Sequence, residues 1–177
     1  DIFPAAVTGW TIAWRSDVPT TFNNVTRPEP GNLELHRGVL GVAHSGNQYA
    51  ELDSDWDGHT NAITGEPAST VISQTVPTIV GASYSVEYYF APRPSTPAAD
   101  SKVEVRWNGT LLDTAGPLAG GGGNLVASDW IHRGPFNFVA TTTSSVVSFT
   151  DAGTANSLGS FIDDVTVLQT ICPAPIN

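Results

Sequence analysis

The 177-residue chain contains no methionine and a single cysteine, Cys172. A lone cysteine cannot form an internal disulfide, so we interpret Cys172 as an inert thiol in a tail, the alternative being a bond to a cysteine outside this sequence. No apolar run approaches the length that crosses a bilayer, and the start of the chain lacks the regions of a secretory signal. We therefore expect a mature or excised extracellular (secreted) domain without membrane insertion, stabilised by something other than disulfides.

Positive charge is also scarce. The chain has 7 Lys and Arg residues against 17 Asp and Glu residues, and its formal net charge is -10 at pH 7. The only lysine is Lys102. Proteins bind nucleic acids and anionic membranes through basic patches, and this sequence has no such patch. We therefore expect neither of them as a partner.

Sustained helical periodicity is missing as well, since no segment keeps an apolar stripe over three helical turns. Instead, turn residues recur about every ten residues between short segments with the composition or alternation of strands. These segments are 9–14, 33–36, 49–55, 69–76, 84–90, 102–107, 136–140, 146–150 and 161–168. The pattern predicts an all-β fold, a two-sheet antiparallel β-sandwich of the jelly-roll type. We expect one domain over residues 1–170 and a proline-containing tail over residues 171–177.

The clearest local signal is Asn108-Gly109, which separates the alternating segment Lys102–Trp107 from Thr110–Leu112. A two-residue hairpin turn of this kind needs positive φ at both positions, which Asn and Gly tolerate best. We therefore predict a tight β-hairpin at this point, with the apolar residues of its first strand facing the core.

The most unusual segment is Tyr49–Gly58, which carries four carboxylates within seven residues. Glu51, Asp53 and Asp55 recur with period two, so in an extended strand they would project from one face, and Asp57 continues the series into a turn. Like charges this close raise one another's pKa unless a positive charge compensates them. Lys and Arg are absent from the neighbouring sequence, which favours a bound divalent cation.

Residues 53–58 match the first half of a calcium-binding loop, Asp-x-Asp-x-Asp-Gly. The twelfth loop position, where a helix–loop–helix site places a bidentate Glu, is Thr64, and no flanking helix is predicted. We therefore expect Ca²⁺ in a loop outside that setting, completed by a distant acid such as Asp163 or Asp164. The expected ligands are Asp53, Asp55, Asp57, the carbonyl oxygen of His59, and Asp163. The alternative is a solvated acidic turn without a metal.

Several segments, taken in order, resemble one known family. They are Gly9–Thr11, Leu33–Leu35, Gly46–Asp53, Ile72–Thr75, Val103–Gly109 and Ser157–Val165. The chain resembles the galactose-binding-like jelly-roll domains of bacterial surface proteins and RTX-type adhesins, which are related to plant cell-wall proteins. The resemblance implies an extracellular module that binds a peptide or a glycan, often with calcium. The family usually begins with Asn-Gly-Ser-Phe-Glu, whose Glu can serve a calcium ion, whereas this chain begins Asp1-Ile2-Phe3-Pro4; the residue that carries over is Asp163.

Ligand contacts are expected at the acidic loop, where an open coordination position on calcium can accept a ligand oxygen. Besides Asp55 and Asp57, Trp56 offers an indole for stacking, the alternative being a ring folded over the sheet. Arg93 lies between prolines and can clamp a ligand carboxylate, or else pair with Asp100. The run Gly120–Gly123 is interpreted as a flexible loop, the alternative being a nest of N–H groups that receives an anion.

These features favour a non-enzymatic, calcium-dependent adhesion module that binds a glycan or a peptide on another cell surface, as a monomeric domain of a larger protein. One alternative is a jelly-roll glycoside hydrolase that uses Glu51, Asp53 and Asp55. Another is a structural spacer domain stapled by calcium. The four histidines show no zinc-binding spacing and are interpreted as surface or structural residues; they are His36, His44, His59 and His132.

Overall fold

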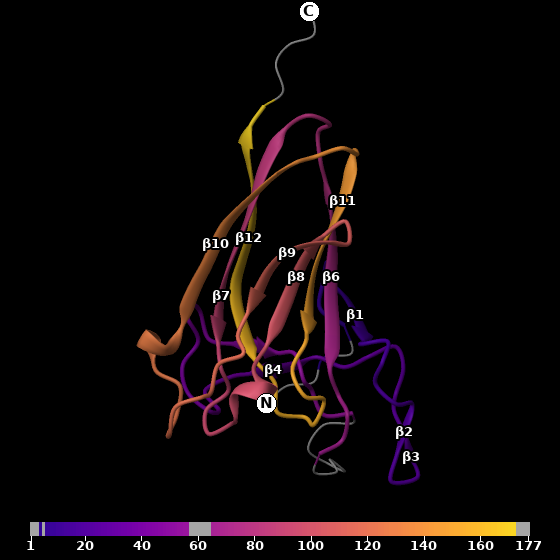
Figure 1. The fold of residues 1–177 in the computed structure, drawn as a ribbon, viewed down its shortest axis with the longest axis vertical. Coiled ribbons are helices and arrows are strands. Elements are labelled where there is room, and N and C mark those ends of the chain that lie inside the picture. The colour runs from indigo at the N-terminus through magenta and orange to yellow at the C-terminus, as the bar shows by residue number, and fades with distance from the viewer. Residues whose placement is uncertain (1–3, 5, 57–64, 173–177) are drawn as a thin grey trace, which may run out of the picture.

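The computed structural model describes residues 4, 6–56 and 65–172, and it forms two packed antiparallel sheets (Figure 1). The first sheet has the order β1-β6-β11-β8-β9, with β1 Thr11–Trp14, β6 Thr70–Pro77, β11 Ser144–Asp151, β8 Val103–Trp107 and β9 Thr110–Ala115. The second has the order β10-β7-β12-β5-β4, with β10 Ile131–Val139, β7 Ser83–Ala91, β12 Phe161–Ile171, β5 Tyr49–Glu51 and β4 Glu34–His36. A small hairpin of β2 Thr21–Phe22 and β3 Val25–Thr26 projects from one end. The predicted all-β sandwich is confirmed.

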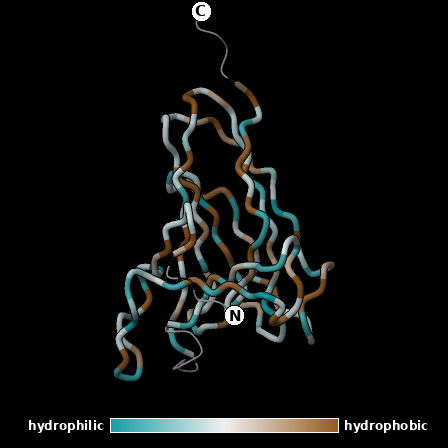
Figure 2. Tube along the Cα trace, turned by 180° about the vertical axis from the view of Figure 1, so that it is seen from behind, coloured by the Kyte–Doolittle hydropathy of each residue, from teal (hydrophilic) through white to brown (hydrophobic). Residues whose placement is uncertain are grey.

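The described residues contain only two short 3-10 helices, Ala98–Asp100 and Ala127–Asp129. No helix in this part of the chain is long and apolar enough to cross a membrane. The dominance of strands follows from the alternation seen in the sequence, which Figure 2 displays as polar and apolar residues succeeding one another along the tube.

The predicted hairpin is confirmed in register and backbone geometry. Trp107 of β8 pairs with Thr110 of β9, and Asn108 and Gly109 have φ values of 46° and 80°. Both turn residues therefore occupy the left-handed region that this turn requires. Val103 and Val105 are fully buried, whereas the charged residues Glu104 and Arg106 are half-buried.

The main core lies between the two sheets. Tyr88 and Phe90 of β7 face Val105 of β8 and Phe149 of β11, and the rings of Tyr88 and Phe149 meet edge to face with centroids 5.2 Å apart. Such a continuous apolar layer is what a two-sheet sandwich needs for stability.

A second apolar cluster covers the other face of β5, β7 and β12 near one end of the sandwich. Tyr49, Phe161 and Trp130 pack there together, and the Trp130 indole donates to the Val42 carbonyl over 3.0 Å. Ala50 faces the main core, so its neighbours Tyr49 and Glu51 must face this second cluster. This end of the second sheet is thus covered on both faces, which is why polar side chains here are buried.

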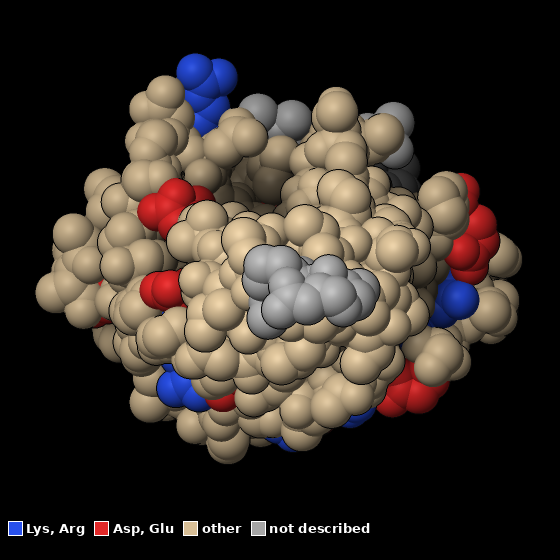
Figure 3. Space-filling view, turned by 90° about the horizontal axis from the view of Figure 1, so that it is seen from above, with Lys and Arg blue, Asp and Glu red and all other residues tan. Residues whose placement is uncertain are grey.

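The opposite end of the sandwich has a different character. Figure 3 views it from the side where β12 leaves the sandwich, and Lys, Arg, Asp and Glu lie toward the rim of the visible face, with uncharged residues between them. Exposed apolar residues on the chain at this end include Ile79, Val80 and Ile171. The acidic groups discussed below belong to the other end.

Candidate functional site

The acidic segment does not form one continuous strand. β5 ends at Glu51, and Asp53 makes only an isolated bridge with Ser69. Leu52 links the two sheets, because its N–H donates to Ser160 and its carbonyl accepts from Thr70 at the start of β6. The expectation that the acids project from one strand face is therefore wrong, because the chain crosses from one sheet to the other between them.

All the described acids of this segment are buried. Glu51 and Asp53 have no exposed surface, and Asp55 is 8 % exposed. Glu34 and Glu66 are buried at the same end. Asp57 and His59 lie outside the described residues, so their role in binding calcium stays a prediction.

Glu51 is the centre of the first polar cluster. Its Oε1 accepts from the Gly159 N–H over 2.7 Å, and its Oε2 lies 2.6 Å from His36 Nε2. Arg93 Nη1 donates to the same Oε2. Arg93 thus supplies the positive charge that the neighbouring sequence lacks, and it pairs with Glu51 rather than with Asp100. Its contact with a ligand stays a prediction.

His36 and Glu34 complete this cluster from the adjacent strand β4. Glu34 pairs in register with Glu51, and His36 Nε2 lies 3.4 Å from Glu34 Oε1. One ligand atom from each of Glu34, His36 and Glu51 falls within 4.8 Å of the others. The cluster brings a nitrogen and two carboxylates together, although the spacing in the sequence pointed to no such group.

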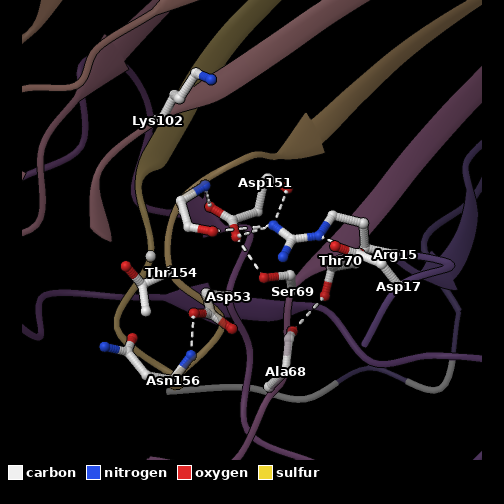
Figure 4. Close-up of polar contacts among 12 residues, drawn as sticks. Arg15, Asp17, Asp53, Ala68, Ser69, Thr70, Lys102, Asp151, Thr154 and Asn156 are labelled. Carbon is white, nitrogen blue, oxygen red and sulfur yellow. Dashed lines mark hydrogen bonds and ion pairs between the residues drawn. The ribbon is translucent and has the colours of Figure 1, made fainter. Parts of the chain in front are cut away.

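Asp53 is the centre of a second cluster, drawn in Figure 4. Its Oδ2 accepts from the Asn156 N–H over 2.9 Å, and its Oδ1 has no hydrogen-bond partner among the described residues. Asp151 lies nearby at the end of β11, where it accepts from the Ser69 hydroxyl over 2.6 Å and lies 3.5 Å from Arg15. An unpartnered oxygen on a fully buried carboxylate suits a cation ligand.

Burial and mutual repulsion shift the pKa values in both clusters. Burial, with the charges of Glu51 and Asp55, raises the pKa of Glu34 to about 8. Burial also raises the pKa of Asp151 to about 7, and burial with the charge of Asp151 raises the pKa of Asp53 well above its ordinary value. These carboxyl groups therefore resist ionisation at neutral pH unless a cation joins them.

This shift predicts how the metal-free protein responds to pH. In EDTA, folded Glu34 and Asp151 keep their protons up to about pH 8 and pH 7, whereas the unfolded chain releases them near 4.5 and 3.8. The folded state binds more protons between these limits, so the free energy of unfolding should fall as pH rises from about 5 to 8. Urea titrations at several pH values test this. Glu34→Gln should make the free energy of unfolding depend less steeply on pH near pH 8. An unchanged dependence would contradict the raised pKa of Glu34.

Asp163 lies apart from Asp53. Phe161 and Ile162 of β12 pair with Glu51 and Ala50 of β5, which puts Asp163 level with Tyr49. Asp53 lies beyond the end of β5, against Gly159, and its Oδ2 accepts from the Asn156 N–H. Asp163 instead accepts from the His44 N–H over 2.9 Å. The hydrogen bonds of Asp163 thus join it to His44 and Ser45 rather than to the Asp53 cluster, and its role as a calcium ligand stays a prediction.

Trp56 belongs to the core in this structure. It is 1 % exposed, its Nε1 donates to the Pro67 carbonyl over 2.9 Å, and it packs with Trp14 and Val18. A ring so enclosed offers no face for a ligand. The alternative noted from the sequence, a ring folded over the protein, is the one that the structure adopts.

Two of the hollows lined by described residues border segments that the sequence singled out. The larger, about 450 Å³, is lined by Pro92 and Pro94 on one side and by the glycine-rich loop on the other, together with Leu118, Ala119, Asn124, Leu125, Val126, Ser128, Asp129 and Ile131. The smaller, about 240 Å³, opens between the sheet edges and is lined by Gln48, Asp163, Asp164 and mostly apolar residues that include Trp10 and Leu35. The glycine run, expected from the sequence to be a flexible loop or an anion nest, thus forms one wall of a hollow.

Comparisons with known proteins place the fold. No protein-family model and no curated protein matches the chain. The K2 adhesin domain of Lys-gingipain is similar with a TM-score of 0.51, 15% identity and coverage of 92% of this chain and 89% of that one. TmCBM61, solved with β-1,4-galactotriose, has a TM-score of 0.50, 14% identity and coverage of 92% and 90%. A family 35 carbohydrate-binding module from Clostridium thermocellum has a TM-score of 0.47, 13% identity and coverage of 91% and 98%.

At these identities the likeness shows the fold alone. It agrees with the fold implied by the resemblance drawn from the sequence, since a carbohydrate-binding module and an adhesin domain share the arrangement of two antiparallel sheets found in this chain. The protein has the fold of a jelly-roll β-sandwich.

Proposed function

We propose that this domain is a non-catalytic module that binds a glycan or a peptide outside the cell, as part of a larger adhesive protein. Support comes from the fold it shares with carbohydrate-binding modules and an adhesin domain. The observation that carries the proposal is that Glu51, Asp53 and Asp55, the residues of the hydrolase alternative, are buried, whereas a hollow of about 450 Å³ is open. An open hollow of this size, apart from the buried acids, favours ligand binding over catalysis by those acids.

The hydrolase alternative has little support. A glycosidase needs two carboxyl groups that flank the scissile bond. Glu51 and Asp53 have no exposed surface, and both oxygens of Glu51 already accept hydrogen bonds. A polysaccharide cannot reach either group without opening the end of the sandwich.

Calcium dependence is part of the proposal. Ca²⁺ takes six to eight oxygen ligands, and the donors at this end are carboxylates. The unpartnered Oδ1 of buried Asp53 supports a cation beside it, with Asp55, Asp57 and the His59 carbonyl as the further proposed ligands. Bound calcium would neutralise the carboxyl groups whose pKa values burial raises.

We place the ligand in the larger hollow. A Cβ at Gly120 would collide with the Arg93 carbonyl, so the loop packs directly against the segment that carries Arg93. Gly121 and Gly122 have no atom within 4 Å of an added Cβ and no positive φ, so neither packing nor conformation within the chain requires glycine there. Their missing side chains keep the hollow open to a ligand.

Array screening tests this function. The protein should bind a subset of glycans or peptides, and EDTA should weaken that binding. Gly122→Trp should fill the hollow and reduce the affinity for the selected ligand at least about tenfold. Thr143→Trp places the same indole at another exposed position and should leave the affinity unchanged. Reducing sugar released from a polysaccharide, and lost in Glu51→Gln, would instead establish a glycosidase.

A further inference from the structure

The cluster of Glu34, His36 and Glu51 has the composition of a metal site that differs from the calcium loop. Its three ligand atoms lie within 4.8 Å of one another, and each residue is at least 97 % buried. Calcium prefers oxygen ligands alone, whereas an imidazole nitrogen with two carboxylates suits Zn²⁺ or Mn²⁺.

The backbone holds these side chains ready. Glu34 lies opposite Glu51 in the β4–β5 ladder, and alternation brings His36 to the same face of the sheet as Glu34. The His36 ring is fixed further by stacking against Tyr49, with centroids 5.3 Å apart, and against Phe161 at 5.2 Å. The donor set is therefore fixed by the sheet and by ring packing, and little ordering is needed on binding.

Electrostatics at the cluster favour a cation. The pKa of Glu34 rises to about 8 even though Arg93 lowers it, because burial and the charges of Glu51 and Asp55 outweigh the guanidinium. Arg93 contacts Glu51 Oε2, and a carboxylate oxygen has two lone pairs, so one remains for a second positive group. In this structure His36 Nε2 lies at that second lone pair, 2.6 Å from Glu51 Oε2.

We propose that Glu34, His36 and Glu51 bind one divalent metal ion of the zinc or manganese class and thereby clamp the edge strand β4 to the second sheet. β4 has three residues and pairs only with β5 among the described strands. The chain has one cysteine, so this clamp would serve where a disulfide cannot. The site does not depend on the proposed ligand binding.

Calorimetry on the full chain tests the site. Because the cluster is buried, the protein is unfolded in urea with EDTA, freed of both, and refolded before titration with ZnCl₂, MnCl₂ or CaCl₂. We expect one Zn²⁺ or Mn²⁺ per chain. His36→Gln should weaken binding at least about 100-fold. His132→Gln removes an exposed His–Glu pair and should leave binding unchanged.

The outcomes separate this site from its competitors. Equal Zn²⁺ binding by wild type and His36→Gln, with both folded by circular dichroism, would overturn the proposal. So would no binding at all, which would leave the cluster as an internal ion pair with Arg93. Loss of Zn²⁺ binding in Glu34→Gln while the array ligand still binds would support the metal site independently of the proposed function.

Discussion

Replacing Arg93 by methionine is expected to lower the free energy of unfolding by about 3–5 kcal/mol. The Arg93 side chain is 19% exposed and pairs with Glu51, which has no exposed surface. Removing the guanidinium leaves a buried carboxylate beside Glu34, and desolvation of that charge is no longer compensated. Urea unfolding at pH 7 in the presence of EDTA measures the change.

Two comparisons make this result specific. Arg106 pairs with Glu104 at 2.8 Å, but the two side chains are 39% and 26% exposed, so Arg106→Met should cost no more than about 1 kcal/mol. Adding Glu51→Gln to Arg93→Met should recover part of the lost stability, because the unpaired charge is gone. Equal losses from Arg93→Met and Arg106→Met would show that burial of Glu51 does not control this end of the sandwich.

The fold was predictable because its strands obey local rules. The segment Lys102–Trp107 alternates, Asn108-Gly109 demands a tight turn, and the structure has both. Strand ends were less predictable: β10 begins at Ile131, where the sequence indicated a strand only from Phe136. Residues 131–135 include a glycine and a proline, and the register of β10 against β7 shifts there, so they carry no clear alternation.

The polar clusters were not predictable, because each depends on pairing between distant segments. A period of two places Glu51, Asp53 and Asp55 on one face only if the whole segment stays in one sheet. At Leu52, however, the chain crosses from the second sheet to the first. Arg93 and Asp151 come close to these acids because of the order of the strands in the two sheets, and no local sequence pattern indicates that order. The alternation of Glu34 and His36 was visible, but only the β4–β5 register brings them to Glu51.

Trp56→Ala is expected to lower the free energy of unfolding by about 3–5 kcal/mol, the usual cost of deleting a large buried aromatic side chain. The indole is 1 % exposed, its Nε1 donates to the Pro67 carbonyl, and its ring meets Phe22 edge to face at 6.5 Å. Alanine would leave a cavity beside Trp14 and remove the partner of a buried carbonyl. Urea unfolding measures the loss, and Trp56→Phe should cost less because it keeps most of the packing.

Ligand binding decides between this structural role and the ligand contact expected from the sequence. At a temperature where Trp56→Phe is fully folded, its affinity for the array ligand should equal that of the wild type, because the indole is enclosed by Trp14, Val18 and Ala68. An anchor residue would behave in the opposite way: Trp56→Ala would keep its stability and lose about 1–3 kcal/mol of binding free energy. That pattern would mean that the end of the sandwich opens to admit the ligand, since a ring with this little exposed surface cannot otherwise be touched.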